Sequence, residues 1–340
     1  MSVLFNLLFT KLTLPPASEI RGKTILITGA NTGLGRATAR HALALGADGV
    51  ILGVRTLSKG EDAKADIERT TGTTNKVLVW PIDMESFASV RAFADRAKAY
   101  VDGGGRLDIA IMNAGIGSRM YRVTDDGWER TLQVNVLSTA LLSLELLPLL
   151  VHSSKTAPSF SSTAQPHLVI IASDAHREVK FTERNSDNIL QCLNEESQWA
   201  KSQKDAGMLE RYAVSKLFAI FITIELARLV PRDGKGEPLV LVNCSTPGFC
   251  KSDLLTREKA PLLLRIVQAL TARTVEEGSK TYLHAATQGF EGHGKWFENQ
   301  LVGDPGPNVT APEQTAVREK VWGEIVAVLK EVDPALRTEY

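Results

Sequence analysis

Tyr212 and Lys216 are two side chains whose types and spacing suit acid–base chemistry. Because they are four residues apart, they lie one turn apart on the same face of a helix. A tyrosine can give up a proton, but its free pKa is about 10, and a nearby positive charge is needed to lower that pKa. Most such pairs are ordinary surface or groove contacts. The pair therefore indicates a catalytic site only if the chain also binds a reactive partner.

A glycine-rich stretch near the amino terminus predicts that partner. Residues 28–35 read TGANTGLG, between a strand-like run at 24–28 and a helical pattern at 34–45. Glycines at a strand-to-helix turn let the pyrophosphate of a dinucleotide approach the backbone and the positive end of the helix. The alternative is a glycine-rich turn without a ligand, and the flanking strand and helix argue against it. The candidate binding residues in this turn are Gly29, Asn31, Thr32, Gly33, Leu34 and Gly35.

The glycine spacing and the Tyr212–Lys216 pair together resemble the short-chain dehydrogenase/reductase family. The order of the motifs extends the resemblance over about residues 20–300. The chain also carries a strand ending in Val-Arg, an SDAH run at 173–176 and a PGFCKSDL turn at 247–254. These details are similar to retinol-dehydrogenase-like and WW-domain-oxidoreductase-like members and to reductases of fungal secondary metabolism.

The resemblance implies a catalytic tetrad of Asn135, Ser173, Tyr212 and Lys216. Tyr212 would be the acid/base, and Lys216 would lower its pKa together with the oxidised nicotinamide. Ser173, which follows a buried strand, would polarise the substrate carbonyl. Asn135 would hold a water molecule that links the lysine to solvent. Taken alone, Asn135 is better explained as a helix-interior asparagine bonded to the backbone, and the presence of all four residues favours the tetrad.

Other positions match those with which members of the family contact the cofactor. Asp83 would lie at the adenine, and Ser252 stands where the family has a threonine that bonds the nicotinamide amide. The tripeptide at 113–115 would lie beneath the cofactor, and it also has a structural explanation, because a buried asparagine needs hydrogen-bond partners. The residues carried over in this way are Asp83, Asn113, Ala114, Gly115, Tyr212, Lys216, Pro247, Gly248 and Ser252.

The form of the cofactor follows from charge at the end of the second strand. An acidic residue there would bond the ribose 2′-hydroxyl of NAD, whereas an arginine favours the 2′-phosphate of NADP. The strand ends in Gly53-Val54-Arg55-Thr56, without a carboxylate. Arg55 therefore predicts NADP(H) in preference to NAD(H). The alternative for Arg55 is a solvated charge at the end of the strand.

The elements that must position these residues alternate between short β-branched runs and longer helical stretches. This alternation predicts an α/β fold, a single Rossmann-type, doubly wound parallel sheet with helices on both faces. Strands are expected at 24–28, 49–54, 76–81, 109–113, 167–173, 239–245 and 295–297. Helices are expected at 34–45, 59–70, 86–100, 125–150, 209–229, 274–288 and 315–332.

Composition excludes several classes of function. The 340 residues include 39 basic and 39 acidic side chains, and a net charge of zero gives no basic face for nucleic acid. The three cysteines, Cys192, Cys244 and Cys250, form neither a disulfide framework nor a metal-ligand spacing. We therefore expect no metal and a cytoplasmic, reducing environment. Cys244 and Cys250 are expected to be small buried hydrophobes.

The catalytic domain is expected at 21–305, between an apolar extension at 1–20 and a helical extension at 306–340. The apolar run 3–14 is too short to cross a membrane, which takes about 20 residues. It is either a short helix packed on the domain or an interfacial helix that gives peripheral membrane contact. Helices 125–150 and 209–229 correspond to those through which the family often forms homodimers.

Two segments are expected to shape the substrate pocket, an insertion at 174–211 and a lid at 249–270. Both are rich in apolar residues, so we expect a hydrophobic or aromatic small-molecule substrate. The favoured function is NADPH-dependent interconversion of a ketone or aldehyde and its alcohol. The alternatives are a non-redox isomerase or cyclase on the same fold, and a nucleotide-binding scaffold without turnover. An intact tetrad argues more strongly against the scaffold than against the isomerase.

Overall fold

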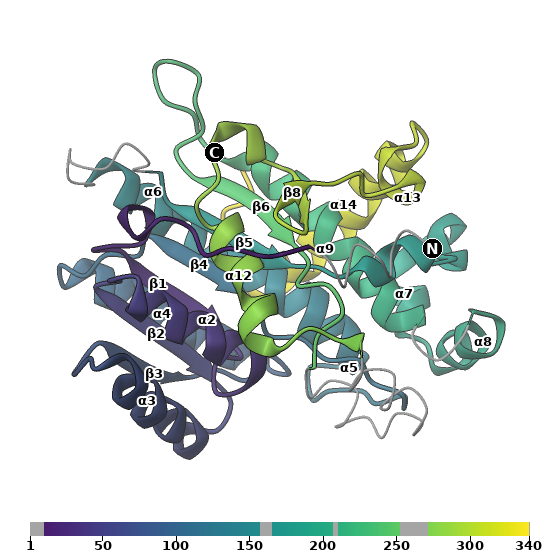
Figure 1. Ribbon diagram of the computed structural model, residues 1–340. Coiled ribbons are helices and arrows are strands. Elements are labelled where there is room, and N and C mark those ends of the chain that lie inside the picture. The colour runs from purple at the N-terminus through teal and green to yellow at the C-terminus, as the bar shows by residue number, and fades with distance from the viewer. Residues whose placement is uncertain (1–9, 157–164, 207–209, 252–270, 340) are drawn as a thin grey trace.

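The computed structural model describes residues 10–156, 165–206, 210–251 and 271–339, arranged around one eight-stranded sheet (Figure 1). The strand order is β3–β2–β1–β4–β5–β6–β7–β8, and only the last pair, β7 with β8, is antiparallel. The bounds are β1 Thr24–Thr28, β2 Gly49–Val54, β3 Val77–Pro81, β4 Ile109–Met112, β5 His167–Ile171, β6 Leu241–Ser245, β7 Trp296–Glu298 and β8 Leu301–Val302. The predicted Rossmann-type doubly wound sheet is confirmed.

Helices cover both faces of the sheet because its strands are apolar on both sides. Side chains alternate along a strand, so Leu26 of β1 packs into one core while Ile25 and Ile27 pack into the other. The first core lies under α4, α6, α9 and α14, and the second under α2, α3 and α12. The bounds are α2 Gly33–Ala44, α3 Leu57–Thr71, α4 Phe87–Asp102, α6 Ser138–Lys155, α9 Glu210–Leu229, α12 Val275–Ala285 and α14 Gln314–Val332.

The chain reverses direction across the sheet between β1 and β4. From β1 it builds outward through β2 to β3, and then returns to place β4 on the other side of β1. At such a switch point the loops leaving the two strands diverge, which opens a crevice at their carboxyl ends. The glycine turn follows β1 and residues 113–115 follow β4, so both candidate cofactor segments border this crevice.

The helix expected at 125–150 begins later and is not regular. It starts as α5 (Arg130–Leu132), where the carboxylate of Glu129 accepts hydrogen bonds from the Thr131 and Leu132 amides. It then passes through a π-helical stretch, η2 (Gln133–Leu137), before α6. Among the described residues, only Arg130–Lys155 is long and apolar enough to cross a membrane. However, 83% of its apolar 18-residue stretch is buried inside the protein. This stretch is therefore a core helix.

The described part of the N-terminal extension packs on the domain without forming the expected helix (Figure 1). Leu12 is buried, and its amide donates to Glu277 of α12 while its carbonyl accepts from Lys280. Thr13 exchanges two hydrogen bonds with the Gln300 side chain at the β7–β8 turn. The backbone is extended because its hydrogen bonds are made to other elements. Residues 1–9, with most of the apolar run, lie outside the described residues.

The insertion and the C-terminal extension pack against each other. The insertion contains η3 (Asp174–Glu178), η4 (Thr182–Asn185), α7 (Ile189–Asn194) and α8 (Glu196–Ala206), and the extension contains α13 (Pro307–Thr310) and α14. Both carboxylate oxygens of Glu324 on α14 accept amides at the start of α7, from Ile189 and Leu190. On the other side, Arg318 of α14 pairs with Glu225 of α9 at 2.6 Å. The C-terminal helix therefore fixes the insertion onto α9.

The insertion also contributes to the main core. Phe181, Ile189 and Leu193 are each no more than 1% exposed and belong to the same core as α6 and α9. The insertion as a whole was expected to form one wall of the substrate pocket. Among the described residues they instead hold the insertion to the domain.

Truncating the packing stripe of α14 should destabilise the protein. Ile325 is fully buried between α14 and the core, so Ile325→Ala should lower the free energy of unfolding by about 2–4 kcal/mol. Leu301→Ala is the matched control, because Leu301 is 70% exposed, and it should change that free energy by less than about 0.5 kcal/mol. Denaturant titration followed by circular dichroism measures both. Equal effects of the two substitutions would contradict the role given to α14.

Candidate active site

The glycine turn between β1 and α2 has the shape of a cradle for a phosphate group. A side chain at Gly35 would meet the Asn113 amide at 2.7 Å and the Gly29 carbonyl at 2.8 Å. Gly33 has a φ of +57°, and a side chain there would meet no atom within 4 Å, so it borders open space. Thr32 makes no side-chain capping bond to α2, and the first turn of α2 has no acidic residue. The helix N-terminus can therefore receive an anion.

Asn113 ties this turn to the end of β4. Its side-chain amide donates to the carbonyls of Thr28 at 2.8 Å and Gly29 at 3.2 Å. In return, the hydroxyl oxygen of Thr28 accepts the backbone amides of Asn113 and Ala114, each at 3.0 Å. The structural explanation of this tripeptide is confirmed, and it places Gly115 at the mouth of the crevice.

The four tetrad residues come together at the carboxyl edge of the sheet. Tyr212 and Lys216 lie one turn apart on α9, with the Lys216 ammonium 5.6 Å from the centre of the Tyr212 ring. The Lys216 ammonium donates to the carbonyl of Ile171, the last residue of β5, at 2.7 Å. Ser173 follows two residues later and forms a side-chain hydrogen bond with Tyr212. The helix and the strand end thus hold a phenol, an ammonium group and a hydroxyl in one place.

Asn135 completes the group from the other side. Its amide donates to the Ile116 carbonyl at 2.7 Å and to the Ser215 hydroxyl at 2.9 Å, and its oxygen accepts the Ile116 amide at 2.9 Å. A side chain built at Gly115 would lie 3.3 Å from the Asn135 oxygen and 3.5 Å from the Lys216 ammonium. Asn135 lies in the π-helical stretch, an irregularity that is common at functional sites. Ser215 was not anticipated; it links Asn135 to the helix of Tyr212.

Burial sets the protonation of these groups. Burial raises the pKa of Tyr212 above its usual range, the hydrogen bond with Ser173 lowers it, and the charge of Asp174 raises it. Burial alone lowers the pKa of Lys216 to about 8. Because burial disfavours the charged form of Lys216, an anionic neighbour such as an ionised Tyr212 would stabilise that charged form.

Arg55 lies at the end of β2, but it is not a solitary charge. Its guanidinium pairs with Glu85 at 2.9 Å, and Glu85 also pairs with Arg130 at 2.8 Å and Arg122 at 3.9 Å. Three arginines surround the Glu85 carboxylate, and with the neighbouring carboxylate of Asp83 they leave one net positive charge at the end of β2. Asp83 lies next to this cluster and accepts the amide of Glu85 at 3.0 Å. Sequence spacing gave no sign of Glu85, because it comes from the loop after β3.

The loop after β6 closes the site from the other side. Gly248 has a φ of +70°, and its amide donates to the Thr246 hydroxyl at 3.2 Å. Ser252 and most of the lid at 249–270 lie outside the described residues. The thiols of Cys244 and Cys250 are buried, and burial raises the pKa of each to about 12, so neither is a thiolate. The expectation that both are buried hydrophobes is confirmed.

Arg211, next to Tyr212, was missed from the sequence. It is 2% exposed, and its guanidinium lies 3.9 Å from the carboxylate of Glu183, which is itself 4% exposed. All three guanidinium nitrogens lack a hydrogen-bond partner, and burial lowers the pKa of Arg211. Arg211 also acts on the buried Glu129 at the start of α5. This charged group connects the insertion to the first turn of the helix that carries Tyr212.

Asp174, directly after Ser173, was also missed, although it belongs to the SDAH run. Burial, and then the charge of Glu298, raise the pKa of Asp174 to about 6, against lowering by Arg177, Arg273 and a hydrogen bond with Thr246. One carboxylate oxygen, Oδ1, is buried without a hydrogen-bond partner. A half-buried carboxyl with an elevated pKa beside a tyrosine and a buried lysine is typical of functional sites.

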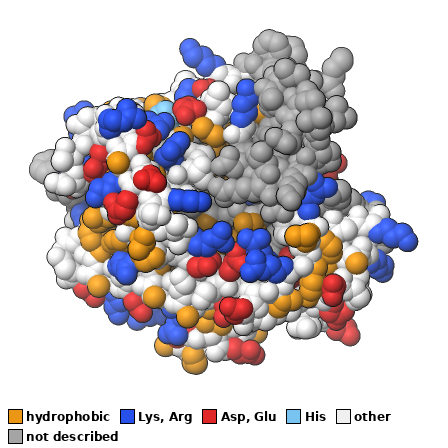
Figure 2. Space-filling view, turned by 90° about the horizontal axis from the view of Figure 1, so that it is seen from below, with side chains coloured by type: hydrophobic (Ala, Val, Ile, Leu, Met, Phe, Trp, Pro, Cys, Tyr) orange, Lys and Arg blue, Asp and Glu red, His pale blue; other side chains and the backbone are white. Residues whose placement is uncertain are grey.

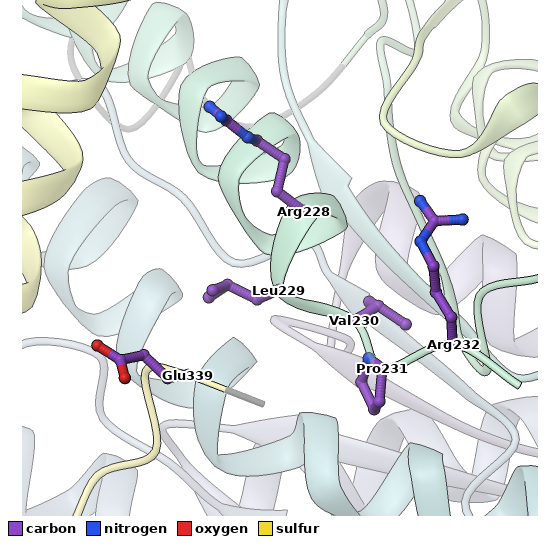
Figure 3. Close-up of a pocket in the computed structure, with 6 residues that line it drawn as sticks. All are labelled: Arg228, Leu229, Val230, Pro231, Arg232 and Glu339. Carbon is purple, nitrogen blue, oxygen red and sulfur yellow. The ribbon is translucent and has the colours of Figure 1, made fainter. Parts of the chain in front are cut away.

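A surface pocket elsewhere on α9 takes no part in this arrangement. It is lined by Arg228, Leu229, Val230, Pro231, Arg232 and Glu339 (Figure 3). Arg228 is 16 residues beyond Tyr212, so the two lie about 24 Å apart along the helix. The face shown in Figure 2 carries basic and acidic side chains close together, without a single-sign patch. Among the described residues, no cluster of three His, Cys, Asp or Glu could hold a metal ion.

Known proteins resemble this chain along its whole length. The short chain dehydrogenase family matches residues 23–173. The chain is 36% identical over 343 residues to the short chain dehydrogenase/reductase dmxR8 of Cryptosporiopsis sp., which covers 100% of both chains. It is 39% identical over 306 residues to the short chain dehydrogenase atnD of Emericella nidulans, covering 88% of this chain and 91% of that one. An uncharacterised protein of Mycobacterium paratuberculosis has a similar structure, with a TM-score of 0.62 and 26% identity over 94% of this chain and 98% of that one.

The raised pKa of Asp174 predicts how stability depends on pH. The folded pKa is about 6 and the model-compound value is 3.8, so ionising Asp174 costs stability as the pH rises through this interval. Asp174→Asn removes the cost. The variant should therefore be more stable than the parent by up to about 3 kcal/mol at about pH 8, and this advantage should vanish near pH 4. Thermal denaturation across that range measures it, and an advantage that grows toward low pH would contradict the assignment.

Proposed function

The chain belongs to the short-chain dehydrogenase/reductase family, and we propose that it is an NADPH-dependent reductase that interconverts a hydrophobic ketone or aldehyde and its alcohol. The observation that carries this proposal is the convergence of Asn135, Ser173, Tyr212 and Lys216 at the edge of the sheet, beside the glycine turn. Few protein sites combine a half-buried tyrosine, a buried lysine and a hydroxyl next to a glycine turn that can receive a dinucleotide.

The residues around the switch point fit a nicotinamide dinucleotide. The glycine turn and the N-terminus of α2 would hold the pyrophosphate, Asp83 would lie at the adenine, and the loop of Pro247 and Gly248 would border the nicotinamide. When bound in its reduced form, the cofactor supplies the hydride. Everything else must come from the chain.

The chain supplies the proton and the orientation. Ser173 donates a hydrogen bond to the substrate carbonyl, and Tyr212 gives its proton to the oxygen as negative charge develops there. Lys216 stabilises the tyrosinate left behind, because its ammonium is buried and lies 5.6 Å from the centre of the Tyr212 ring, where water screens their attraction only partly. Asn135 fixes the loop after β4 against α9, which keeps Gly115 of that loop beside Lys216.

The arginines around Glu85 support NADP(H) over NAD(H). The 2′-phosphate carries negative charge that a 2′-hydroxyl lacks, and Arg55, Arg122 and Arg130 leave an excess of positive charge at the end of β2. Arg55 has a side chain that is 61% exposed, so it can turn from Glu85 to a phosphate without leaving the cluster.

Exposed apolar side chains near the site support a hydrophobic substrate. Met120 is 75% exposed and Val123 is 42% exposed, both in the loop after β4. Between them, Tyr121 packs edge-on against Trp199 of the insertion, with ring centres 6.2 Å apart. The insertion and this loop together give the described part of the site an aromatic rim. The lid at 249–270 would form the opposite wall.

The C-terminal extension bears on subunit assembly. The family often forms dimers through the helices that correspond to α6 and α9, but here α14 packs along α9 with Arg318 and Glu319 paired to residues of that helix. We infer that α14 takes the place of a partner subunit along α9.

Removing the charge of Arg55 tests the cofactor preference. Arg55→Ala should weaken NADPH binding by about 10- to 100-fold, the worth of a charge-assisted hydrogen bond, and should leave NADH binding within about threefold. Arg232→Ala is the matched control, since Arg232 is an exposed arginine in the distant pocket. Titration followed by nucleotide fluorescence gives both dissociation constants. A parent chain that binds NADH as tightly as NADPH would overturn the preference.

Removing the hydroxyl of Tyr212 tests the reaction. Tyr212→Phe should lower kcat for NADPH-dependent ketone reduction by about 100- to 10,000-fold, because the general acid is lost. Tyr100→Phe removes a hydroxyl far from the site and should keep full activity. The loss of NADPH absorbance with a panel of aromatic ketones measures the rate. Product formed from the parent chain without consumption of NADPH would instead favour an isomerase.

A further inference from the structure

Four charged side chains lie at the carboxyl ends of β5, β6 and β7, next to Ser173. They are Asp174, Arg177, Arg273 and Glu298. The charges of the last three shift the pKa of Asp174. Asp174 follows Ser173 directly and forms a side-chain hydrogen bond with Thr246, the residue after β6. Its charge also acts on Tyr212 and on Cys250. Asp174 therefore lies at the carboxyl end of β5, beside Ser173 and within electrostatic reach of Tyr212.

Arg273, just before α12, packs against the loop that follows β6. Its backbone amide donates to Phe249 at 2.9 Å, and its carbonyl accepts the amide of Lys251 at 2.8 Å. These two bonds hold Arg273 against the loop that follows Pro247 and Gly248. The Arg273 residue is 8% exposed, and one guanidinium nitrogen donates to Asn299 at 2.7 Å.

Two of the four charges satisfy each other, and two do not. Arg177 pairs with Glu298 at 3.0 Å and stacks on the Trp296 ring at 4.5 Å. Asp174 and Arg273 form no ion pair within 4.0 Å of each other among the described residues, although the charge of Arg273 lowers the pKa of Asp174. Within the part of the chain that the structure describes, neither Oδ1 of Asp174 nor Nη1 of Arg273 has a hydrogen-bond partner, and both atoms are buried. The two residues are anchored at neighbouring strand ends, because Asp174 bonds Thr246 after β6 and Arg273 bonds Asn299 after β7.

Few kinds of chemical group could hydrogen-bond with both Oδ1 of Asp174 and Nη1 of Arg273. Two acids and two arginines sum to zero charge, so neither an anion nor a cation is favoured at this point. A hydroxyl is neutral and can donate to the carboxylate while accepting from the guanidinium through a single oxygen atom. An apolar group in the same place would leave two buried polar atoms unpaired, which is costly.

We propose that Asp174 and Arg273 form a recognition pair for a hydroxyl group on the substrate, close to the carbonyl that Ser173 and Tyr212 bind. The inference rests on the proposed ketone reduction and narrows its substrates to hydroxylated ketones. The hydroxyl donates to Oδ1 of Asp174 and accepts from Nη1 of Arg273. It undergoes no reaction; it fixes the ring to which the carbonyl belongs.

A series of tetralones that are alike except for one hydroxyl at successive ring positions tests the pair. The parent chain should reduce one hydroxytetralone with a kcat/KM at least about 30-fold above that of unsubstituted tetralone. Asp174→Leu and Arg273→Met should each bring that ratio to within about threefold of one. Asp174→Asn keeps the shape and the acceptor oxygen, and it should keep part of the preference. Glu178→Leu, on the exposed side of the same η3 helix, is the matched control and should leave the ratio unchanged.

Two results would overturn the inference while leaving the reductase intact. One is reduction of tetralone at least as efficient as that of every hydroxylated analogue. The other is a preference that survives unchanged in Asp174→Leu and Arg273→Met, as expected if only a water molecule bridges the pair. Tight NADPH binding without reduction of any member of the series would overturn the proposed ketone reduction itself, and this inference with it.

Discussion

The hydrogen bonds between Asn113 and the end of β1 are the contacts on which the site depends. Thr28 precedes the glycine turn and Asn113 precedes Gly115, so four bonds hold together the two loops that diverge at the switch point. Gly115 in turn lies against Asn135 and Lys216. A displacement at this one junction would move the nucleotide cradle relative to the helix of Tyr212. The position of the glycine turn relative to Tyr212 and Lys216 is therefore set by one small polar network between neighbouring strands.

The groups around this network are held in environments that disfavour their charges. Burial lowers the pKa of Lys216 to about 8 and raises that of Asp174 to about 6, and Arg211 has no hydrogen-bond partner. Each of these costs folding free energy, of which a domain has only about 5–15 kcal/mol in total. The continuous cores on both faces of the sheet offset that cost. Strain of this kind survives where function requires it.

The local sequence pattern was enough to predict the strands, the glycine turn and the placement of Tyr212 and Lys216 on one helix face. Each of these depends on residues close together in the sequence. Long-range pairs were not predictable in this way. Glu85 meets Arg55 only because β2 and β3 are neighbours, and Arg211 meets Glu183 only once the insertion has folded back. The apolar residues of the insertion were assigned to a pocket because hydrophobicity alone does not distinguish a core from a binding wall. The structure distinguishes them: Phe181, Ile189 and Leu193 are in the core.

That distinction changes how the enzyme would select a substrate. If most apolar residues of the insertion serve packing, the rim of Met120, Tyr121 and Trp199 can bind many flat hydrophobic molecules with little discrimination. A hydrophobic wall separates ligands that differ by one small group only by about 1–3 kcal/mol, whereas a buried polar group left unpaired excludes them far more strongly. Selectivity in such a site must come from its few buried polar atoms. Asp174 follows Ser173 directly and the charge of Arg273 acts on it, so in the proposed recognition pair both would act on the part of the substrate next to the reacting carbonyl.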